Sequence, residues 1–339
     1  MRTHQGEAGS VSIAALVLLL LLAAVAGGGA LIFGTALSRE RKSEEAGDVR
    51  GAMRREGQRI VQALAADPTP QSDCPFDPVW SAVGRPELDG ASVTLADISS
   101  GLNPNWVQKN VFEKTGLRGL LRPGRSADEL QQRREDRGFS SNAAAGYGDL
   151  FTAGAVEKYL TTYGPVNINV TDEFALRRLY ALRTGDAAAS EVFHAKVQAL
   201  LRQKKILARE ELRTFLAADY DRLFPVMNVE PVLNAHFVDP VILAELLAYP
   251  ELKVPQPLQA AQDIMAARQR SELSNGQLRG MIGAPDDSRI YQYVGAVTWF
   301  WRISVIHPAA LLTMVAARIP TDPDSPAQFC IVEERFCRR

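Results

Sequence analysis

The hydrophobic pattern is strongest near the start of the chain, where the 27 residues from Val11 to Leu37 include no charge. A helix of this length rises roughly 40 Å, which exceeds the hydrocarbon core of a bilayer at about 30 Å. A secretory signal has a shorter apolar region with a small-residue cleavage site after it, whereas this run continues into the charged segment 38–42. We therefore predict a retained membrane helix at residues 11–37.

Helical periodicity continues beyond the apolar run. Apolar residues recur at spacings of four, seven and four positions, at Val49, Met53, Ile60 and Leu64. Asp67-Pro68 ends the pattern, because a residue before proline avoids the helical conformation. A juxtamembrane helix lying on its own domain is the simpler interpretation. The more specific one is a single helix from about residue 11 to residue 66, half in lipid and half packed on a globular head.

Strand-like patterns occur at both ends of the soluble part. Alternation over Ala91 to Ile98 predicts a first strand, after a loop region over 67–90. Helices are expected within 106–114 and 127–137, and segment 140–148 is a small, polar connection. Segments 289–306, 309–319 and 328–336 predict an antiparallel meander of about three strands. We therefore predict an α+β fold, in which the amphipathic end of the N-terminal helix covers this small sheet.

An internal repeat occupies the region between these strands, with units near 166–216 and 233–282. The units align at an offset of 67 residues, with a one-residue slip in their second halves. The aligned pairs are Val166-Asn167 with Leu233-Asn234, Asp172 with Asp239, Leu176 with Leu243, Leu179 with Leu246, Ala181 with Ala248, Arg202 with Arg268, Leu212 with Leu278, and Leu216 with Ile282. We predict two helix-hairpin-helix-like units whose apolar positions form a core.

Charge is balanced along the chain. The 38 basic and 39 acidic residues give a net charge of -1, which excludes a strongly basic nucleic-acid binder. Residues 143–284 hold 15 basic and 16 acidic residues, so the repeats lack the positive surface that DNA phosphates need. A protein-contact scaffold is the favoured interpretation of the repeats. A membrane-anchored DNA-uptake protein that binds DNA through them is the alternative.

Catalytic motifs are absent from the sequence. The four histidines form no His-x-x-x-His pair, there is no Cys-x-x-Cys, and no Gly-x-Ser-x-Gly or phosphate-binding glycine loop occurs. We therefore predict a protein that is not an enzyme.

Acidic loops and cysteines supply the remaining candidate sites. Calcium prefers several carboxylate and carbonyl oxygens, and the calcium candidates lie in two loops, at Asp286, Asp287, Asp322 and Asp324. Solvated turns are the alternative, because no twelve-residue calcium loop is present. A disulfide between Cys330 and Cys337 at the last strand is a further candidate, which would leave Cys74 unpaired.

Two segments carry a family resemblance. Tyr159 to Asn169 (YLTTYGPVNIN), with Leu176 seven residues on, is similar to an extended Tyr/Thr segment that leads into an Asn-x-Asn turn and a helix. The second segment, Ala96-Asp97-Ile98 followed by Leu102 to Asn105 (LNPN), resembles an earlier Asp and Asn-x-Asn segment. With the long helix, the late meander and the α insert, these features resemble the general secretion pathway protein K family, a minor pseudopilin of type II secretion.

The resemblance implies a processed N-terminus. Residues 1–9 would form a prepilin leader that prepilin peptidase removes after Gly9, so that Ser10 begins the mature chain. Ala14 then stands at the fifth position, where most pseudopilins carry Glu. The family's K subunit lacks this Glu, as expected of a subunit that starts a fibre, because an unpaired carboxylate in lipid is costly.

The resemblance also implies an organisation and partners. The expected regions are the leader 1–9, a helix 10–66, a first head segment 67–100, an inserted α-domain 101–284 and a β meander 285–339. Arg39, Arg41 and Lys42 favour a cytoplasmic C-terminal part, whereas the resemblance favours export. We follow the resemblance and expect an inner-membrane protein with a periplasmic C-terminal part. Its partners would be other minor pseudopilins and the major pseudopilin, without nucleic acid and with calcium as the candidate cofactor.

Overall fold

The computed structural model describes residues 48–137, 147–321 and 325–339. The chain divides into two compact units, Met1–Arg55 and Glu56–Arg339, and every strand among the described residues lies in the second. Within the described ranges, no helix is both long and apolar enough to cross a bilayer. The predicted membrane helix at 11–37 lies outside these ranges.

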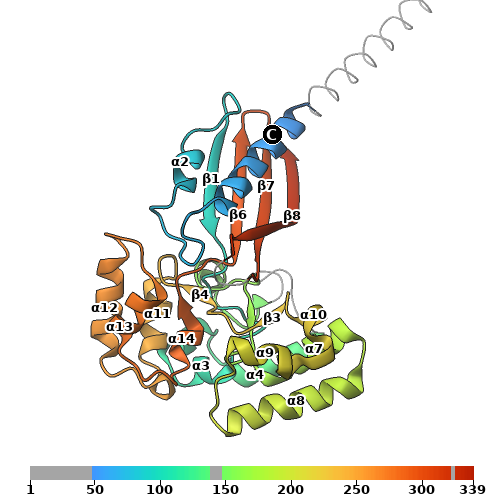
Figure 1. The fold of residues 1–339 in the computed structure, drawn as a ribbon, viewed down its shortest axis with the longest axis vertical. Helices are drawn as coiled ribbons and strands as arrows, with labels where there is room; N and C mark the ends of the chain where they lie inside the picture. Colours follow the sequence, from blue (N-terminus) through green and yellow to red (C-terminus); the bar gives the residue numbers. More distant parts are fainter. Residues whose placement is uncertain (1–47, 138–146, 322–324) are drawn as a thin grey trace, which may run out of the picture. The chain divides into compact units, whose positions relative to one another are not determined.

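A four-stranded antiparallel sheet joins the two ends of the second unit (Figure 1). Its order is β1-β6-β7-β8, with the bounds Ser92–Asp97, Phe300–His307, Ala310–Ile319 and Gln328–Arg338. Side chains alternate in burial as a half-covered sheet requires: Trp301, Ile303 and Val305 are fully buried. The predicted meander is therefore present, and the first strand completes it by pairing with β6.

The helical segment before the first loop covers this sheet. Residues 56–65 are helical and run across the strands in Figure 1. Gly57 allows the close approach, because a Cβ there would lie 2.3 Å from the Met314 sulfur of β7. Ile60 and Leu64, which the helical spacing had marked as apolar, are buried. Arg59 ties the helix to the neighbouring helix α2 (Val79–Val83) by donating to the Ala82 carbonyl at 2.8 Å.

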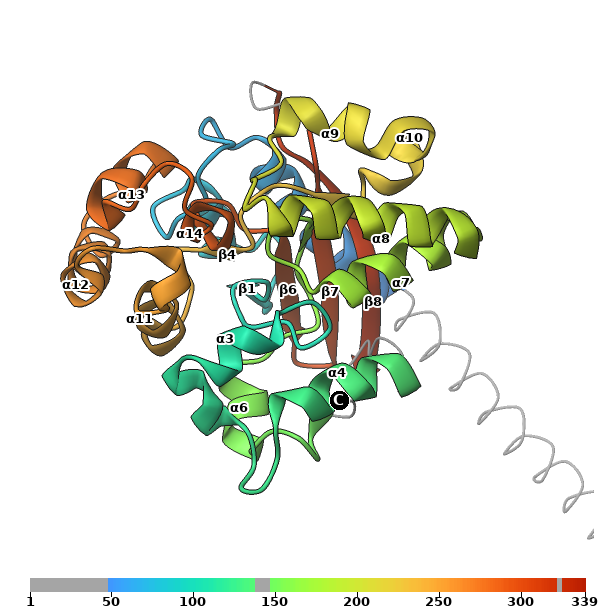
Figure 2. The same cartoon turned by 90° about the horizontal axis from the view of Figure 1, so that it is seen from below.

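Between the adjacent strands β1 and β6 the chain inserts a helical region (Figure 2). Its elements are α3 (Lys109–Glu113), η1 (Gly116–Leu120), α4 (Ala127–Arg137), α6 (Ala153–Lys158), β2 (Val166–Asn167), α7 (Glu173–Thr184), α8 (Ala187–Arg202), α9 (Arg209–Leu216), η2 (Ala217–Asp219), α10 (Tyr220–Leu223), β3 (Met227–Asn228), β4 (Leu233–Asn234), α11 (Pro240–Leu247), η3 (Pro250–Leu252), α12 (Pro257–Ala267), α13 (Asn275–Ile282), α14 (Ile290–Tyr293) and β5 (Val294–Gly295).

The duplication is structural as well as sequential. Each unit begins with a two-residue strand that pairs in parallel with a second short strand after the helices, β2 with β3 and β4 with β5. Asp172 and Asp239 cap the first helices of the two units. The aligned residues Leu176 and Leu243 are fully buried, as the repeat predicts for core positions.

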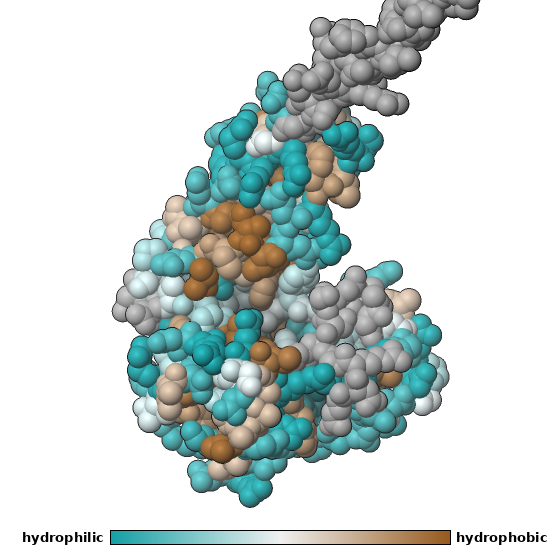
Figure 3. Space-filling model, turned by 90° about the vertical axis from the view of Figure 1, so that its right-hand side faces the viewer, coloured by the Kyte–Doolittle hydropathy of each residue, from teal (hydrophilic) through white to brown (hydrophobic). Residues whose placement is uncertain are grey.

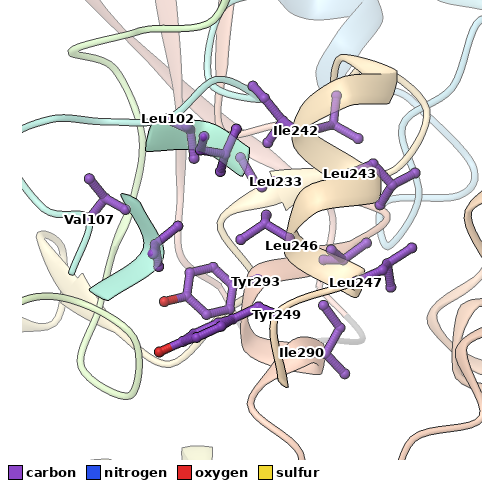
Figure 4. Close-up of a cluster of buried hydrophobic side chains, with 14 of the residues drawn as sticks. Leu102, Val107, Leu233, Ile242, Leu243, Leu246, Leu247, Tyr249, Ile290 and Tyr293 are labelled. Atoms are coloured by element: carbon purple, nitrogen blue, oxygen red, sulfur yellow. The ribbon is translucent and has the colours of Figure 1, made fainter. Parts of the chain in front are cut away.

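Where the structure describes the helical region, its buried apolar residues form a larger and a smaller core. The larger spans both ends of the insert and includes α11, whose Leu246 points toward the rings of Tyr249 and Tyr293 in Figure 4. The smaller belongs to the first unit and contains Leu176, Phe193 and Leu212, among others. Each unit therefore buries its own apolar stripe.

Two predicted elements were wrong in extent. Residues 289–299 do not extend the first strand of the meander; they form α14 and β5, because Tyr291 and Tyr293 are buried in the larger helical core and Val294 pairs with Leu233. The helix expected over 106–114 is confined to Lys109–Glu113. A turn precedes it, in which the Trp106 amide donates to the Asn103 carbonyl at 3.0 Å.

Candidate functional site

A buried polar network lies where the loop before β1 meets the strands and the second repeat. At its centre, Arg318 of β7 donates from Nη2 to Oδ1 of Asp73 at 2.5 Å. The same guanidinium donates to the carbonyls of Thr298 and Pro70, at 3.1 and 3.0 Å. Both side chains are almost fully buried, so the pair depends on these further hydrogen bonds to satisfy its polar atoms.

Asp73 makes contacts with three separate parts of the chain. The amide of Thr298 donates to Asp73 Oδ2 at 2.7 Å, and the side-chain amide of Asn234 donates to the Asp73 carbonyl at 2.8 Å. Burial raises the pKa of the Asp73 carboxyl to about 7, although Arg318 and the Thr298 amide both act to lower it. Asp73 therefore links the loop to the sheet through its carboxylate and to the second repeat through its backbone carbonyl.

Asp97, at the end of β1, holds the other side of the network. Its carboxylate accepts from the hydroxyls of Ser99, Ser100 and Thr298. Ser100 connects Asp97 to the second repeat, because its Oγ also accepts from the backbone amide of Asn234 at 2.9 Å. Burial raises the pKa of Asp97, and the hydrogen bonds from Ser100 and Ser99 oppose that shift. The network thus fixes the end of β1 against the strand that begins the second repeat.

One carboxylate cluster in this region could hold a metal ion. Asp67, Asp73 and Asp77 bring one oxygen each to within 4.8 Å of one another. Calcium takes six to eight oxygens, so the three carboxylates would supply part of a shell. All three already have partners. Asp67 accepts from the amide and hydroxyl of Thr69 at 2.9 and 3.0 Å, Asp73 pairs with Arg318, and Asp77 accepts from the Cys74 amide and thiol at 2.7 and 2.8 Å. These contacts give the cluster a structural role without an ion.

We did not predict this cluster from the sequence, because all three aspartates lie in segment 67–90, whose pattern predicts only a loop. The available signal was their close spacing, but the partner that explains Asp73 lies 245 positions away. No local pattern identifies such a pairing.

The predicted calcium residues do not come together where the structure describes them. The carboxylate of Asp286 lies 3.4 Å from the guanidinium of Arg279, and that of Asp287 lies 3.6 Å from the ammonium of Lys253. Both carboxylates are exposed and face different cations. Asp322 and Asp324 lie outside the described residues. Calcium binding at these four residues stays a prediction of the sequence.

The predicted Cys330–Cys337 disulfide is wrong within the chain. Both residues lie on β8, where Cys330 pairs with Ala317 and Cys337 with Leu311. Seven residues along a strand span roughly 23 Å, whereas bridged cysteines need Cα atoms within about 7 Å. Both thiols are free and exposed, and Cys74 is free and buried. The prediction failed because it placed the two cysteines just beyond the two ends of the last strand, whereas both lie within it.

The Asn residues at the start of each repeat have equivalent roles. Asn167 and Asn234 are both fully buried, and each side-chain oxygen accepts from the backbone amide two residues on, at 2.8 Å. Each side-chain nitrogen donates to a distant carbonyl, that of Glu230 for the first and that of Asp73 for the second, also at 2.8 Å. These turns are therefore structural, and they set the angle at which each first helix begins.

The two hairpins differ in their turns. The first, between α7 and α8, contains Gly185 in the left-handed conformation at φ 74°. The second contains the short η3 helix and ends in Lys253, which is left-handed at φ 53°. A paired glycine turn that presents backbone amides to phosphate is therefore not common to both units.

The candidates for processing and assembly, Gly9, Ser10 and Ala14, lie outside the described residues. They stay predictions of the sequence.

Comparisons with known proteins give a weak structural similarity. No protein-family model matches the chain, and no curated protein matches it. Among solved structures, it is similar to a chain of the GspK-GspI-GspJ complex of the type 2 secretion system from enterotoxigenic Escherichia coli. The identity is 13%, the TM-score is 0.31, and the match covers 88% of this chain and 98% of that chain. A TM-score of this size carries no argument about function.

Proposed function

We propose that this protein is a non-enzymatic minor pseudopilin at the tip of a type II secretion pseudopilus, where it helps to initiate assembly and protein export. One observation carries the proposal. A helix covers a small antiparallel sheet, and a helical region is inserted between the adjacent strands β1 and β6. This is the arrangement that the resemblance to the K family implies for a pilin-like head with an α insert.

The N-terminal sequence supports the same proposal. Gly9 precedes the uncharged run, as in a prepilin leader, and Ala14 replaces the Glu that a subunit inside the fibre uses. A tip subunit has no subunit above it whose amine needs a carboxylate partner, so Ala14 removes an unpaired charge from lipid.

The insert supports a position at the end of the fibre. It adds two helical units to one side of the head, which subunits packed on all sides would not accommodate. Its near-neutral charge fits contact with proteins better than contact with DNA. Its partners would be other minor pseudopilins, and the chain would be anchored in the inner membrane with its head in the periplasm.

Processing of the N-terminus tests the proposal. In cells that hold a type II secretion system, Gly9→Leu should leave the leader attached and reduce secretion, as measured by intact mass and by export of a secreted enzyme. The matched control is Gly6→Leu, which changes a glycine within the leader and should still be processed. Normal cleavage and secretion with Gly9→Leu would contradict the proposal. Retardation of duplex DNA by the purified chain at physiological salt would instead support DNA uptake.

A further inference from the structure

A cavity of about 420 Å³ lies between three helices of the insert. Gln131 and Arg134 reach it from α4, residues of α7 line its floor, and Ser190 and Glu191 close it from α8. Figures 1 and 2 both show α7 and α8 side by side with α4 close to α7. No residue of this cavity takes part in the network around Asp73, so the cavity is a separate feature.

The cavity contains a buried arginine with one unsatisfied nitrogen. Arg134 donates from Nε to the Pro104 carbonyl at 2.7 Å and from Nη2 to the Val107 carbonyl at 2.6 Å. Its side chain is 4% exposed, and Nη1 has no hydrogen-bond acceptor among the described residues. A buried donor without an acceptor costs about 1–3 kcal/mol, so such groups are rare in native proteins unless a ligand completes them.

The nearest carboxylate does not complete this group. Asp172 Oδ2 lies 3.6 Å from Arg134 Nη1, which is a charge contact and too long for a hydrogen bond. The other oxygen of Asp172 is occupied, because it accepts from the amides of Phe174 and Ala175 at the start of α7. Asp172 therefore balances the charge of Arg134 but leaves a donor of the guanidinium free for another oxygen.

The charge of the lining favours an anion. Three guanidinium groups line the cavity, those of Arg134, Arg177 and Arg178, against the two carboxylates of Asp172 and Glu191. Arg177 reaches Glu191 at 3.2 Å near the surface, where the pair is a third or more exposed. The donor of Arg134 that lacks an acceptor is buried, and charge-assisted hydrogen bonds are strongest in such a site.

The apolar part of the lining selects among anions. Phe174, Ala175 and Ala181 form hydrocarbon walls beside the arginines. A carboxylate on a short CH₂ stem would place its oxygens at Arg134 and its stem against these walls, whereas phosphate has no such stem. We propose that this cavity binds a carboxylate on a short aliphatic stem, held by Arg134 and Arg177. A free small dicarboxylate and an acidic side chain of a protein segment share this chemistry.

Calorimetric titration of the purified full chain tests the proposal, with succinate, its neutral diamide, inorganic phosphate and a capped Gly-Glu-Glu-Gly peptide as probes. We expect saturable binding of succinate or the peptide, and none of the diamide. Preference for the peptide would identify a protein segment as the source, and preference for succinate a small metabolite. Tighter binding of phosphate would overturn the ligand class.

Variants locate the binding. Arg177→Gln should weaken binding about tenfold, because it removes one charge-assisted contact without touching the backbone bonds of Arg134. The matched control is Arg279→Gln. Arg279 is another exposed arginine, which lies on α13 away from the cavity and pairs with Asp286. Equal weakening in both variants, or no saturable binding to the folded chain at millimolar concentrations of any probe, would overturn the proposal.

Discussion

The carboxylate of Asp73 and the guanidinium of Arg318 meet at 2.5 Å in the interior, with their side chains 2% and 6% exposed. The pair joins a loop that precedes β1 to a strand near the end of the chain. Since both groups are desolvated, each depends on the other for its charge balance.

Arg318→Met should therefore destabilise the protein by about 3–5 kcal/mol, because it leaves the Asp73 carboxylate buried without its partner. The loss should be larger at pH 8 than at pH 5, where Asp73 can bind a proton. Urea unfolding at the two pH values measures both effects. Arg279→Met, which breaks an exposed pair with Asp286, is the control and should change little. Equal small effects of the two substitutions would show that the buried pair is dispensable.

His236 should make stability depend on pH. Burial and the nearby Arg268 lower its pKa from 6.5 to about 4, and its Nε2 accepts from the Leu273 amide at 3.0 Å. The unfolded chain therefore binds a proton more readily, so stability is lost as pH falls from about 6.5 to about 4, by up to about 3 kcal/mol. The raised pKa of Asp73 acts in the opposite direction, because its contribution is lost as pH rises from about 4 to about 7.

A comparison of variants separates the two effects. His236→Gln keeps an acceptor near the Leu273 amide and should remove the loss on acidification that His236 causes. His307→Gln, at the end of β6, is the control and should leave the wild-type pH profile in place. Guanidinium unfolding at several pH values gives the profiles. Identical profiles for all three proteins would contradict the buried, neutral state of His236.

Gly57 should not accept a larger side chain. A Cβ at this helical position would lie 2.3 Å from the sulfur of Met314, which is fully buried and has little room to move. Gly57→Val should therefore destabilise the protein by about 1–3 kcal/mol. Gly280→Val provides the control within α13, because a Cβ there has no neighbour within 4 Å. Thermal unfolding compares them, and similar melting temperatures would mean that helix and strand are further apart than the structure has them.

The three cysteines should differ in reactivity. Cys330 and Cys337 are exposed on β8, whereas Cys74 is buried and its pKa is raised to about 12 by burial and by its hydrogen bond to Asp77. Because the thiolate is the reactive form, a maleimide should modify the first two rapidly and Cys74 only after unfolding. Mass spectrometry of the labelled chain measures this. Recovery of a peptide with Cys330 linked to Cys337 would contradict the strand assignment.

The sequence predicted the elements whose residues repeat locally. Alternation identified the strands that became β1, β7 and β8, and the offset of 67 identified the duplicated units with their Asp caps and buried leucines. The short strands β3 and β5 were missed, because two residues carry no periodic signal, although they too are 67 positions apart.

The sites were predicted less well, for the same reason. Acidic loop residues suggested calcium at Asp286 and Asp287, but their partners are exposed cations that sequence spacing does not reveal. The behaviour of Asp73 depends on its burial and on the distant Arg318, and that of Arg134 on its burial and on the Pro104 carbonyl. Only the tertiary structure brings these groups together. Local pattern therefore predicts elements, whereas buried charge depends on long-range packing.

The insertion between β1 and β6 affects the order in which the protein can fold. Ser92 pairs with Ile306, so the first strand is synthesised well before the strand beside it, and the intervening chain must be closed into a loop before the ladder forms. Contacts within each helical unit are far more local and form faster. The surface over the sheet therefore forms late in folding. It includes the brown group of apolar residues seen in Figure 3. The sheet therefore stays open until its last strands are available, at a stage when the helical units have already formed.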